Sequence, residues 1–397
     1  MGRGPGLARC SRSELISVGA RVLVLDERDP EARVALVPMH VATLRGLGLE
    51  VAVVTGAGVA ASFDDAQYAE VGADIIPANL RHEAVSRADV VLAVCTIDAL
   101  DAERMKTGAL ALSFLQARHS GEVIRALTGS GASAMSFEAI PRISRAQSMD
   151  ALTSQALVGG YRAGLVAAEL LPRFFPLLMT AAGTIQPARV VVLGAGVAGL
   201  QAIATAKRLG AVVSAYDVRP SSADEVRSMG ATFISLDLES LEGAGGYARE
   251  MTEDRAARQR DLLAPHIADA DVVITTAAVP GRPAPLLVTA AMVQAMRNGS
   301  VVVDLAAESG GNVEGSIAGQ VVAIGGAVVW GAKDVPSQMP VHASQLYSAN
   351  VVAVLKLLTR ESAIVLDTDD EIVDSALIVH EGTVRDDALR SELGIGG

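Results

Sequence analysis

The segment Gly194-Ala-Gly196-Val-Ala-Gly199 restricts the possible folds of this chain more than any other feature. It follows the apolar run Val190–Leu193, which is typical of a buried strand, and it opens the helical pattern Leu200–Leu209. In a dinucleotide-binding α/β unit the first glycine makes a tight turn, the second lets the backbone approach a pyrophosphate, and the third lets the helix pack on the strand. The helix N-terminus then faces the phosphates with free N–H groups. The sequence therefore predicts a dinucleotide site here, and a tight turn without a ligand is the alternative.

The residue that would bind the adenosine ribose is Asp217, at the end of the next strand candidate. A carboxylate there accepts hydrogen bonds from both ribose hydroxyls and repels a 2′-phosphate, so NAD(H) is favoured over NADP(H). Arg219 complicates this expectation, because a nearby arginine is how other sites accept NADP.

A second glycine segment, Gly56-Ala-Gly58-Val-Ala-Ala61, also follows a strand candidate. It continues into Ser62-Phe-Asp-Asp65, whose two carboxylates would compete with phosphates at a helix N-terminus. We expect this segment to be a loop between a strand and a helix, without a bound nucleotide.

Apolar runs of strand type alternate with helical stretches along most of the chain, which is the pattern of α/β units with parallel sheets. The first series of strand candidates is 21–26, 50–55, 73–76, 90–94 and 109–113, with a helix at 38–48. The second series is 189–193, 212–216, 232–235, 272–276, 300–304 and 326–330. Aromatic residues make up only 3% of the chain, so its core must be built from Ala, Val, Leu and Ile.

The two series predict an α/β fold with two Rossmann-like lobes, each with a parallel sheet, and a cleft between them. A long helical stretch from 148 to 174, broken by Pro172 and Pro176, lies between the series. The apolar helical pattern 343–359 comes too late for the second series, so we expect the chain to cross back to the first lobe. The expected domains are a flexible tail at 1–19, a first lobe at 20–150 completed by 340–397, and an NAD-binding Rossmann lobe at 151–339.

Composition and charge exclude several other classes of protein. With 33 Lys and Arg against 45 Asp and Glu, the net charge of −12 does not suit a nucleic-acid binder. The longest uncharged stretch, 190–206, is short for a membrane span and contains the glycine motif, so no span is expected. Two cysteines and six scattered histidines have no metal-ligand spacing, and no signal peptide is evident, so we expect a cytoplasmic protein without a metal site.

The segment from Arg142 to Gln155, which contains Gln147, Asp150 and Thr153, resembles a loop of the NAD(H)-binding component of proton-translocating NAD(P) transhydrogenase. The resemblance extends over nearly the whole chain from Arg33. Its further motifs are Arg33–Pro38, Gly194–Gly199, Tyr216–Arg219, Gly245–Ala248, Ile274–Gly281 and Asp304–Asn312. It also covers the alanine dehydrogenases, which share the two-lobed framework.

The resemblance implies an enzyme subunit that passes hydride directly from NADH to NADP⁺ held by a partner subunit. No general acid or base is needed, because catalysis rests on bringing two nicotinamide rings to ~3–3.5 Å in the correct orientation. Arg142 and Asp150 would form a charge pair holding the loop and the nicotinamide end of NAD(H). Gln147 would lie near the nicotinamide and reach toward the partner's nucleotide. Thr153 stands where the family commonly has serine.

The remaining implied contacts are with NAD(H). They are Ile143, Ser144, Gly194, Gly196, Val197, Ala198, Gly199, Asp217, Val218, Arg219, Gly246, Tyr247 and Ala278. The glycine-rich segment 239–247 resembles a mobile loop that closes over the bound nucleotide through Tyr247. A flexible linker without a role is the alternative for this segment.

The competing enzyme is an alanine dehydrogenase, which needs charged groups to hold a carboxylate and to handle protons on nitrogen. That family has a lysine in the strand where this chain has Ala93 and Cys95, and a histidine at Gln116. Its catalytic aspartate corresponds to Glu308. These losses argue against amino-acid dehydrogenation, although Arg33, which could hold a carboxylate, remains. A non-catalytic NAD-binding protein is the third hypothesis.

Transhydrogenase function would require partner subunits. The resemblance implies a membrane-spanning subunit, an NADP(H)-binding subunit and a homodimer of this chain. This chain would then be peripheral on the inner face of the cytoplasmic membrane, with proton movement in the membrane subunit coupled to hydride transfer.

Overall fold

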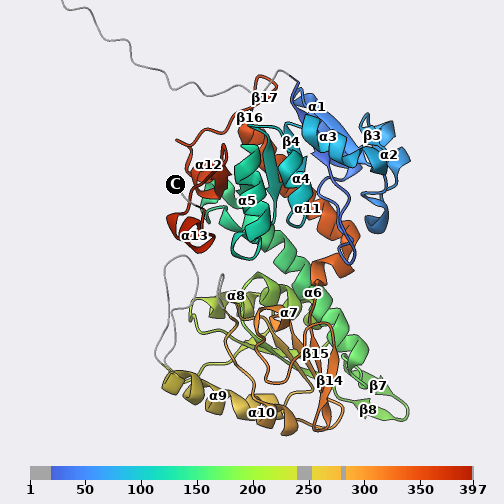
Figure 1. The fold of residues 1–397 in the computed structure, drawn as a ribbon. Coiled ribbons are helices and arrows are strands. Elements are labelled where there is room, and N and C mark those ends of the chain that lie inside the picture. Colours follow the sequence, from blue (N-terminus) through green and yellow to red (C-terminus); the bar gives the residue numbers. More distant parts are fainter. Residues whose placement is uncertain (1–18, 239–252, 279–282, 396–397) are drawn as a thin grey trace, which may run out of the picture. The chain divides into compact units, whose positions relative to one another are not determined.

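The computed structural model describes residues 19–238, 253–278 and 283–395. They divide into two units, each built around one sheet (Figure 1). The first unit comprises the described residues up to Leu152 and from Pro340 onward, and the second comprises those from Thr153 to Met339. The tail expected at 1–19 lies, except for Gly19, outside the described residues.

The first unit contains an eight-stranded sheet of order β19-β18-β6-β5-β4-β1-β2-β3. Its strands are β1 (Arg21–Val24), β2 (Glu50–Val54), β3 (Asp74–Ile76), β4 (Val90–Leu92), β5 (Leu110–Ser113), β6 (Ser133–Ser136), β18 (Leu377–His380) and β19 (Thr383–Val384). The strands from β6 to β3 are parallel, and β18 and β19 are antiparallel additions at one edge. Both faces of the central strands are buried, which explains why their sequences are continuous apolar runs.

Helices cover both faces of this sheet. They are α1 (Pro38–Gly46), α2 (Asp65–Glu70), α3 (Arg81–Arg87), α4 (Ala99–Arg104), α5 (Gly121–Ser130), α11 (Pro340–Leu358), α12 (Glu371–Ala376) and α13 (Asp387–Glu392). α11, orange in Figure 1, comes from late in the chain but packs against α1. Tyr347 on α11 is fully buried, its ring lies 5.0 Å from that of Phe137, and its hydroxyl donates to Ala93 O at 2.8 Å. The helix predicted at 343–359 therefore forms part of the core of the first unit.

The second unit contains a seven-stranded sheet of order β11-β10-β9-β12-β13-β15-β14. Its strands are β9 (Arg189–Leu193), β10 (Val212–Tyr216), β11 (Thr232–Phe233), β12 (Val272–Thr275), β13 (Val301–Asp304), β14 (Val321–Ile324) and β15 (Ala327–Gly331). All pair in parallel except β14, which is antiparallel to β15. From β9 the chain builds the sheet first toward β11 and then, from β12, in the other direction. Ligands of such sheets bind where the strand order reverses, at the carboxyl ends of β9 and β12.

The long helix predicted between the two series is α6 (Ala151–Leu170), which ends just before Pro172. It packs closely on α7 (Val197–Arg208) through two glycines. A Cβ on Gly160 would lie 2.0 Å from Ala198 O, and one on Gly164 would lie 2.8 Å from Thr205 Cγ2. These two glycines let the helices approach more closely than larger residues would.

The remaining described elements of the second unit are α8 (Ser222–Ser228), α9 (Glu253–Ala268), α10 (Ala290–Gln294) and the hairpin of β7 (Leu178–Thr180) and β8 (Gly183–Ile185). Within the described residues, no helix combines the length and apolar character needed to cross a membrane. The α/β class with two lobes and parallel-rich sheets, predicted from the sequence, is confirmed.

Candidate functional site

The glycine loop after β9 has a different requirement at each glycine. Gly194 has a φ of +103°, and a Cβ there would lie 2.6 Å from Thr276 Oγ1. A Cβ on Gly199 would lie 1.9 Å from Gly194 O, so only glycine lets α7 pack so tightly on the turn. Gly196, in contrast, has nothing within 4 Å of an added Cβ. The loop is therefore closed on its protein side and open at the glycine where a pyrophosphate would approach.

The N-terminus of α7 suits an anion. Its N-cap is Gly196, which provides no side-chain hydrogen bond, and its first turn contains no acidic residue. The amides at the start of a helix lack intrahelical partners, and the helix dipole places partial positive charge there. The site can therefore receive the phosphates of a dinucleotide.

Asp217 follows β10, and its carboxylate joins two parts of the site. Its Oδ2 accepts from Ala195 N in the glycine loop at 2.8 Å and from Arg219 Nη2 at 3.0 Å. Its Oδ1 accepts from Arg219 N and Arg219 Nε, each at 2.9 Å. The predicted ribose acid therefore lies beside the glycine loop, and Arg219 is paired with it.

The loop after β12 completes this edge of the second unit. Asn312 is fully buried, accepts from Ala277 N at 3.1 Å, and donates Nδ2 to Ala277 O and Pro285 O, each at 2.8 Å. The buried Asp304 accepts in turn from Asn312 N. These two side chains fix the backbone that leads to the predicted contact Ala278. In the sequence, Asn312 stands out only as the end of a motif that resembles the family. The signal for its structural role is a polar residue that closely follows the acid ending β13.

The segment from Arg142 to Thr153 has a well-anchored backbone. Residues Ser144–Met149 form a 3₁₀ helix, and its Ala146 and Met149 are buried in the core of the first unit. Asn350 Nδ2 on α11 donates to Ser148 O at 2.8 Å, and Arg145 pairs with Asp370 at 2.6 Å.

Two of the predicted nicotinamide residues, Arg142 and Gln147, are exposed on this anchored backbone. Asp150 and Thr153 are half-buried at and just after its end. The pairing of Arg142 with Asp150 stays a prediction.

The structure brings one set of predicted residues together in the second unit, and a second set belongs to the first unit. Glycines 194, 196 and 199, with Val197, Ala198, Asp217, Val218, Arg219 and Ala278, lie on or beside the loops after β9, β10 and β12. Arg142, Ile143, Ser144, Gln147 and Asp150 belong to the first unit. The predicted lid residues Gly246 and Tyr247 lie outside the described residues. A single site formed by both units stays a prediction.

In the first unit, the chain's own carboxylates bind the amides that follow the strands. Glu27 accepts from Val94 N and Cys95 N after β4. Glu138 accepts from Leu115 N and Gln116 N, both at 3.1 Å, after β5. Burial raises the pKa of Glu27 to about 7.

The second glycine segment is a loop between strand and helix, as predicted. Asp65 accepts from Gly56 N at 2.9 Å and from Thr55 Oγ1 at 2.5 Å. Asp64 caps α2 by accepting from Gln67 N at 2.9 Å. These carboxylates occupy the positions that phosphate oxygens would need.

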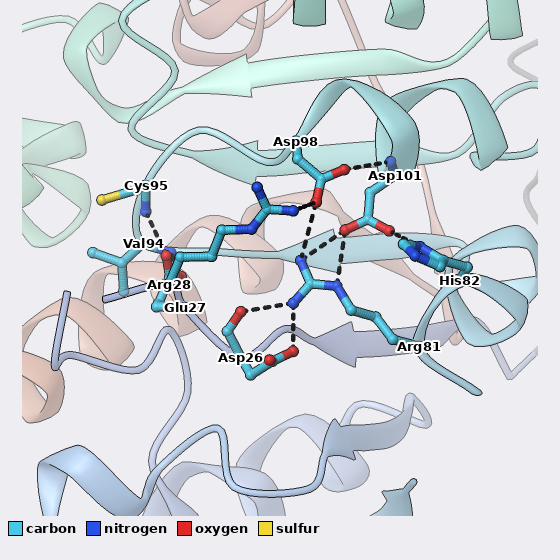
Figure 2. Close-up of polar contacts among 9 residues, drawn as sticks. All are labelled: Asp26, Glu27, Arg28, Arg81, His82, Val94, Cys95, Asp98 and Asp101. Carbon is cyan, nitrogen blue, oxygen red and sulfur yellow. Dashed lines mark hydrogen bonds and ion pairs between the residues drawn. The ribbon is translucent and has the colours of Figure 1, made fainter. Parts of the chain in front are cut away.

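Arg81 is the centre of an ionic network after β1 (Figure 2). It donates to Asp26 and, through Nε and Nη2, to the fully buried Asp101. The other oxygen of Asp101 lies 2.7 Å from His82 Nδ1, and Asp98 caps α4 by accepting from Asp101 N. The network ties the segment after β1 to α3 and α4. Its acids and bases are paired with one another, which indicates a structural role.

Arg33, the candidate carboxylate-binding residue, is engaged by Glu31. Its Nε and Nη2 donate to the two carboxylate oxygens of Glu31 at 2.8 and 2.7 Å, and each side chain is only 10% exposed. The nearby Cys95 thiol lies 3.5 Å from Glu31, and burial raises its pKa to about 12. The first unit therefore fills its arginine with an internal carboxylate, and it has a weakly acidic thiol close to where alanine dehydrogenases have a lysine.

Comparison with known proteins agrees with the division into two units. The family description "Alanine dehydrogenase/PNT, N-terminal domain" matches residues 23–159, and "Alanine dehydrogenase/PNT, C-terminal domain" matches residues 163–387. In Rhodospirillum rubrum, the alpha subunit of NAD(P) transhydrogenase is made in more than one piece. The first of these pieces is 43% identical to this chain over 385 residues, covering 94% of this chain and 99% of that protein.

Two further relatives separate the branches of the family. A crystal structure of transhydrogenase from Sinorhizobium meliloti superposes with a TM-score of 0.83 at 42% identity, covering 92% of this chain and 99% of that one. Alanine dehydrogenase of Mycobacterium tuberculosis is 31% identical over 294 residues, or 73% of each chain. The chain therefore belongs to the alanine dehydrogenase/PNT family, in which it groups with the transhydrogenase α subunits.

Proposed function

We propose that this chain binds NAD(H) in its second unit and works as a transhydrogenase subunit that exchanges hydride with NADP(H) on a partner subunit. The site residues fit a dinucleotide: Gly196 is open, the α7 N-terminus is uncapped by any side chain, and Asp217 is hydrogen-bonded to the glycine loop. When bound, NADH supplies the hydride and NADP⁺ on the partner accepts it.

The roles that we assign to this chain's residues are binding and orientation. Gly194–Gly199 and Asp217 hold the adenosine and pyrophosphate end. Arg142 and Asp150 position the nicotinamide end, Gln147 reaches toward the partner's nucleotide, and Thr153 supplies a hydroxyl nearby. Val197, Ala198, Val218 and Ala278 line the second unit's part of the site, and Ile143 and Ser144 the first unit's part. Orientation alone supplies a large part of the rate enhancement when two reactants are held in an attack geometry.

The observation that carries this proposal over amino-acid dehydrogenation is the Arg33–Glu31 pair. An amino-acid or keto-acid substrate needs a cation for its carboxylate, and here Glu31 already binds Arg33 through both oxygens. Ala93 is buried and its carbonyl accepts from Tyr347, so this position offers no proton donor either. Gln116 has no ionisable proton to exchange at neutral pH.

The proposed function requires partners. A membrane-spanning subunit and an NADP(H)-binding subunit would complete the enzyme, and this chain would form a homodimer on the inner face of the cytoplasmic membrane. Proton movement would take place in the membrane subunit and be coupled to hydride transfer at the contact between the nucleotide-binding subunits.

One experiment separates the three hypotheses. The purified chain is mixed with NADH, pyruvate and ammonium, binding is followed by NADH fluorescence and oxidation by absorbance, and an NADP⁺-loaded NADP(H)-binding transhydrogenase subunit is then added. We expect binding without oxidation at first, and oxidation once the partner is present. Oxidation with pyruvate and ammonium alone would make the chain an amino-acid dehydrogenase. Binding with no oxidation in either mixture would make it a non-catalytic NAD-binding protein.

A further inference from the structure

The carboxylate of Asp217 has its acceptor positions filled by the protein itself. A carboxylate offers about four lone-pair positions. Oδ1 accepts from the amide and Nε of Arg219, and Oδ2 accepts from Ala195 N and Arg219 Nη2. The two hydroxyls of an adenosine ribose would need two of these positions.

The guanidinium of Arg219 is the donor that can leave. The other two donors are backbone amides, held by the glycine loop and by the turn after β10. The Arg219 side chain is 23% exposed, whereas that of Asp217 is 7% exposed. Solvent therefore reaches the arginine, which can exchange its bonds to Asp217 for bonds to water.

Arg219 also changes the charge that a nucleotide meets. Without it, Asp217 would present a full negative charge and repel a 2′-phosphate. With the guanidinium chelating both oxygens, the pair is close to neutral, and the released arginine is itself a good partner for a phosphate.

From this geometry we infer that Arg219 is a specificity-determining residue that competes with the ribose for Asp217, weakening NAD(H) binding and softening the exclusion of NADP(H). This inference rests on the proposed function, because it requires a dinucleotide in the second unit. It reverses the simpler expectation that Arg219 is a direct contact for NAD(H).

The test is a pair of titrations, with NADH and with NADPH, on the wild-type chain and on Arg219→Ala. An exposed ion pair is worth at most about 1 kcal/mol, which corresponds to about fivefold in affinity. We expect Arg219→Ala to bind NADH about three- to fivefold more tightly and NADPH about fivefold more weakly. The ratio of the two dissociation constants would therefore change by at least about tenfold.

Two further variants separate charge from geometry. Arg219→Lys keeps the positive charge but lacks the planar fork, so we expect NADPH binding close to wild type and NADH binding between the other two proteins. Arg227→Ala removes an exposed arginine that pairs with Asp224 on α8, in the same unit, and should change neither affinity.

Weaker NADH binding by Arg219→Ala would overturn the inference, because Arg219 would then contact the nucleotide. Unchanged binding of both nucleotides would overturn it as well, because the arginine would then not compete. In either case NADH binding by the wild-type chain leaves the proposed function standing. A wild-type chain that binds no NADH would instead defeat the proposed function, and the inference with it.

Discussion

The pentapeptide Gly-Ala-Gly-Val-Ala occurs twice, at residues 56–60 after β2 and at residues 194–198 after β9, with opposite outcomes. In the second unit it leads directly into α7, whose N-cap has no side-chain partner. In the first unit it forms a short 3₁₀ turn, and α2 starts only at Asp65, capped by Asp64. The same five residues therefore produce an open anion site in one unit and a self-satisfied loop in the other.

The residues that follow the pentapeptide explain the difference. Gly199 lets the helix start against the turn, since a Cβ there would lie 1.9 Å from Gly194 O. The first unit has Ala61 at this position, followed by Ser62 in the left-handed region with a φ of +64°. The Asp65 carboxylate then accepts from Gly56 N, as a phosphate would. A glycine motif therefore predicts a phosphate site only together with its sixth residue and the charges of the next turn.

The largest effect is expected from making the second segment like the first. Gly199→Ala would force α7 away from the turn, which we expect to cost about 1–3 kcal/mol of stability. It should also weaken NADH binding by at least about hundredfold, because the amides at the helix start would be misplaced. Calorimetric titration with NADH and thermal unfolding measure the two effects.

The matched control for that variant is Gly159→Ala on α6, where nothing lies within 4 Å of an added Cβ. Near-normal NADH affinity in Gly199→Ala would show that the sixth residue does not separate the two segments.

A second prediction concerns the first unit's contribution to the site. Gln147→Ala removes an exposed side chain from an anchored backbone, so the fold should be unaffected. If Gln147 positions the nicotinamide toward the partner, hydride transfer with the partner present should fall about hundredfold while NADH binding changes less than about twofold. Ser148→Ala, also exposed on the same turn, is the control. Equal losses in binding and transfer would refute the positioning role.

Glu27 allows the closed strand ends of the first unit to be tested by pH. Its pKa is raised by burial from 4.5 to about 7, so the folded chain holds this proton more tightly than the unfolded chain. Stability is therefore greatest below pH 4.5 as far as Glu27 is concerned, and this contribution is lost as the pH rises through about 7. The loss should be about 3 kcal/mol.

Urea unfolding at several pH values measures this contribution. In Glu27→Gln, which has no proton to release there, the loss of stability between pH 4.5 and 7 should be smaller than in the wild type. Identical pH profiles in the two proteins would contradict the buried, proton-retaining environment of Glu27.

The smallest expected effect is on the cap of α2. Asp64→Ala removes the capping hydrogen bond to Gln67 N and should cost about 1 kcal/mol of stability. NADH binding should not change, because this loop belongs to the first unit and is filled by its own side chains. Glu70→Ala at the other end of the same helix is the control for changes in helix propensity and charge. A change in NADH affinity in Asp64→Ala would place the nucleotide at the wrong glycine segment.

The strands that are long, apolar and buried on both faces, such as β9 and β12, could be predicted from the sequence to within one or two residues. Strand β6 was missed, because its Ser-Ala-Met-Ser sequence has no β-branched residue, and so was the two-residue strand β19. These strands form because neighbouring strands pair with them, which a local pattern does not show. The hairpin β7–β8 and the antiparallel edge strand β14 were missed in the same way.

For the site, the glycine loop and Asp217 could be predicted, because each rests on a local spacing with one geometric meaning. The bidentate pairs Arg219–Asp217 and Arg33–Glu31 could not, although each joins residues only two positions apart. Whether such neighbours pair or point apart depends on side-chain rotamers set by the surrounding fold. Both pairs change the chemistry expected from the residues alone.

The most direct test of the contrast between the two units is amide hydrogen exchange of the intact chain with and without NADH. We predict slower exchange on NADH binding at residues 194–200 and 216–219 and in the segment 142–150. Residues 56–65 and 94–96, whose amides include several that the chain's own carboxylates bind, should exchange at the same rate in both states. Protection confined to residues 56–65 or 94–96 would contradict the assignment of the nucleotide to the second unit.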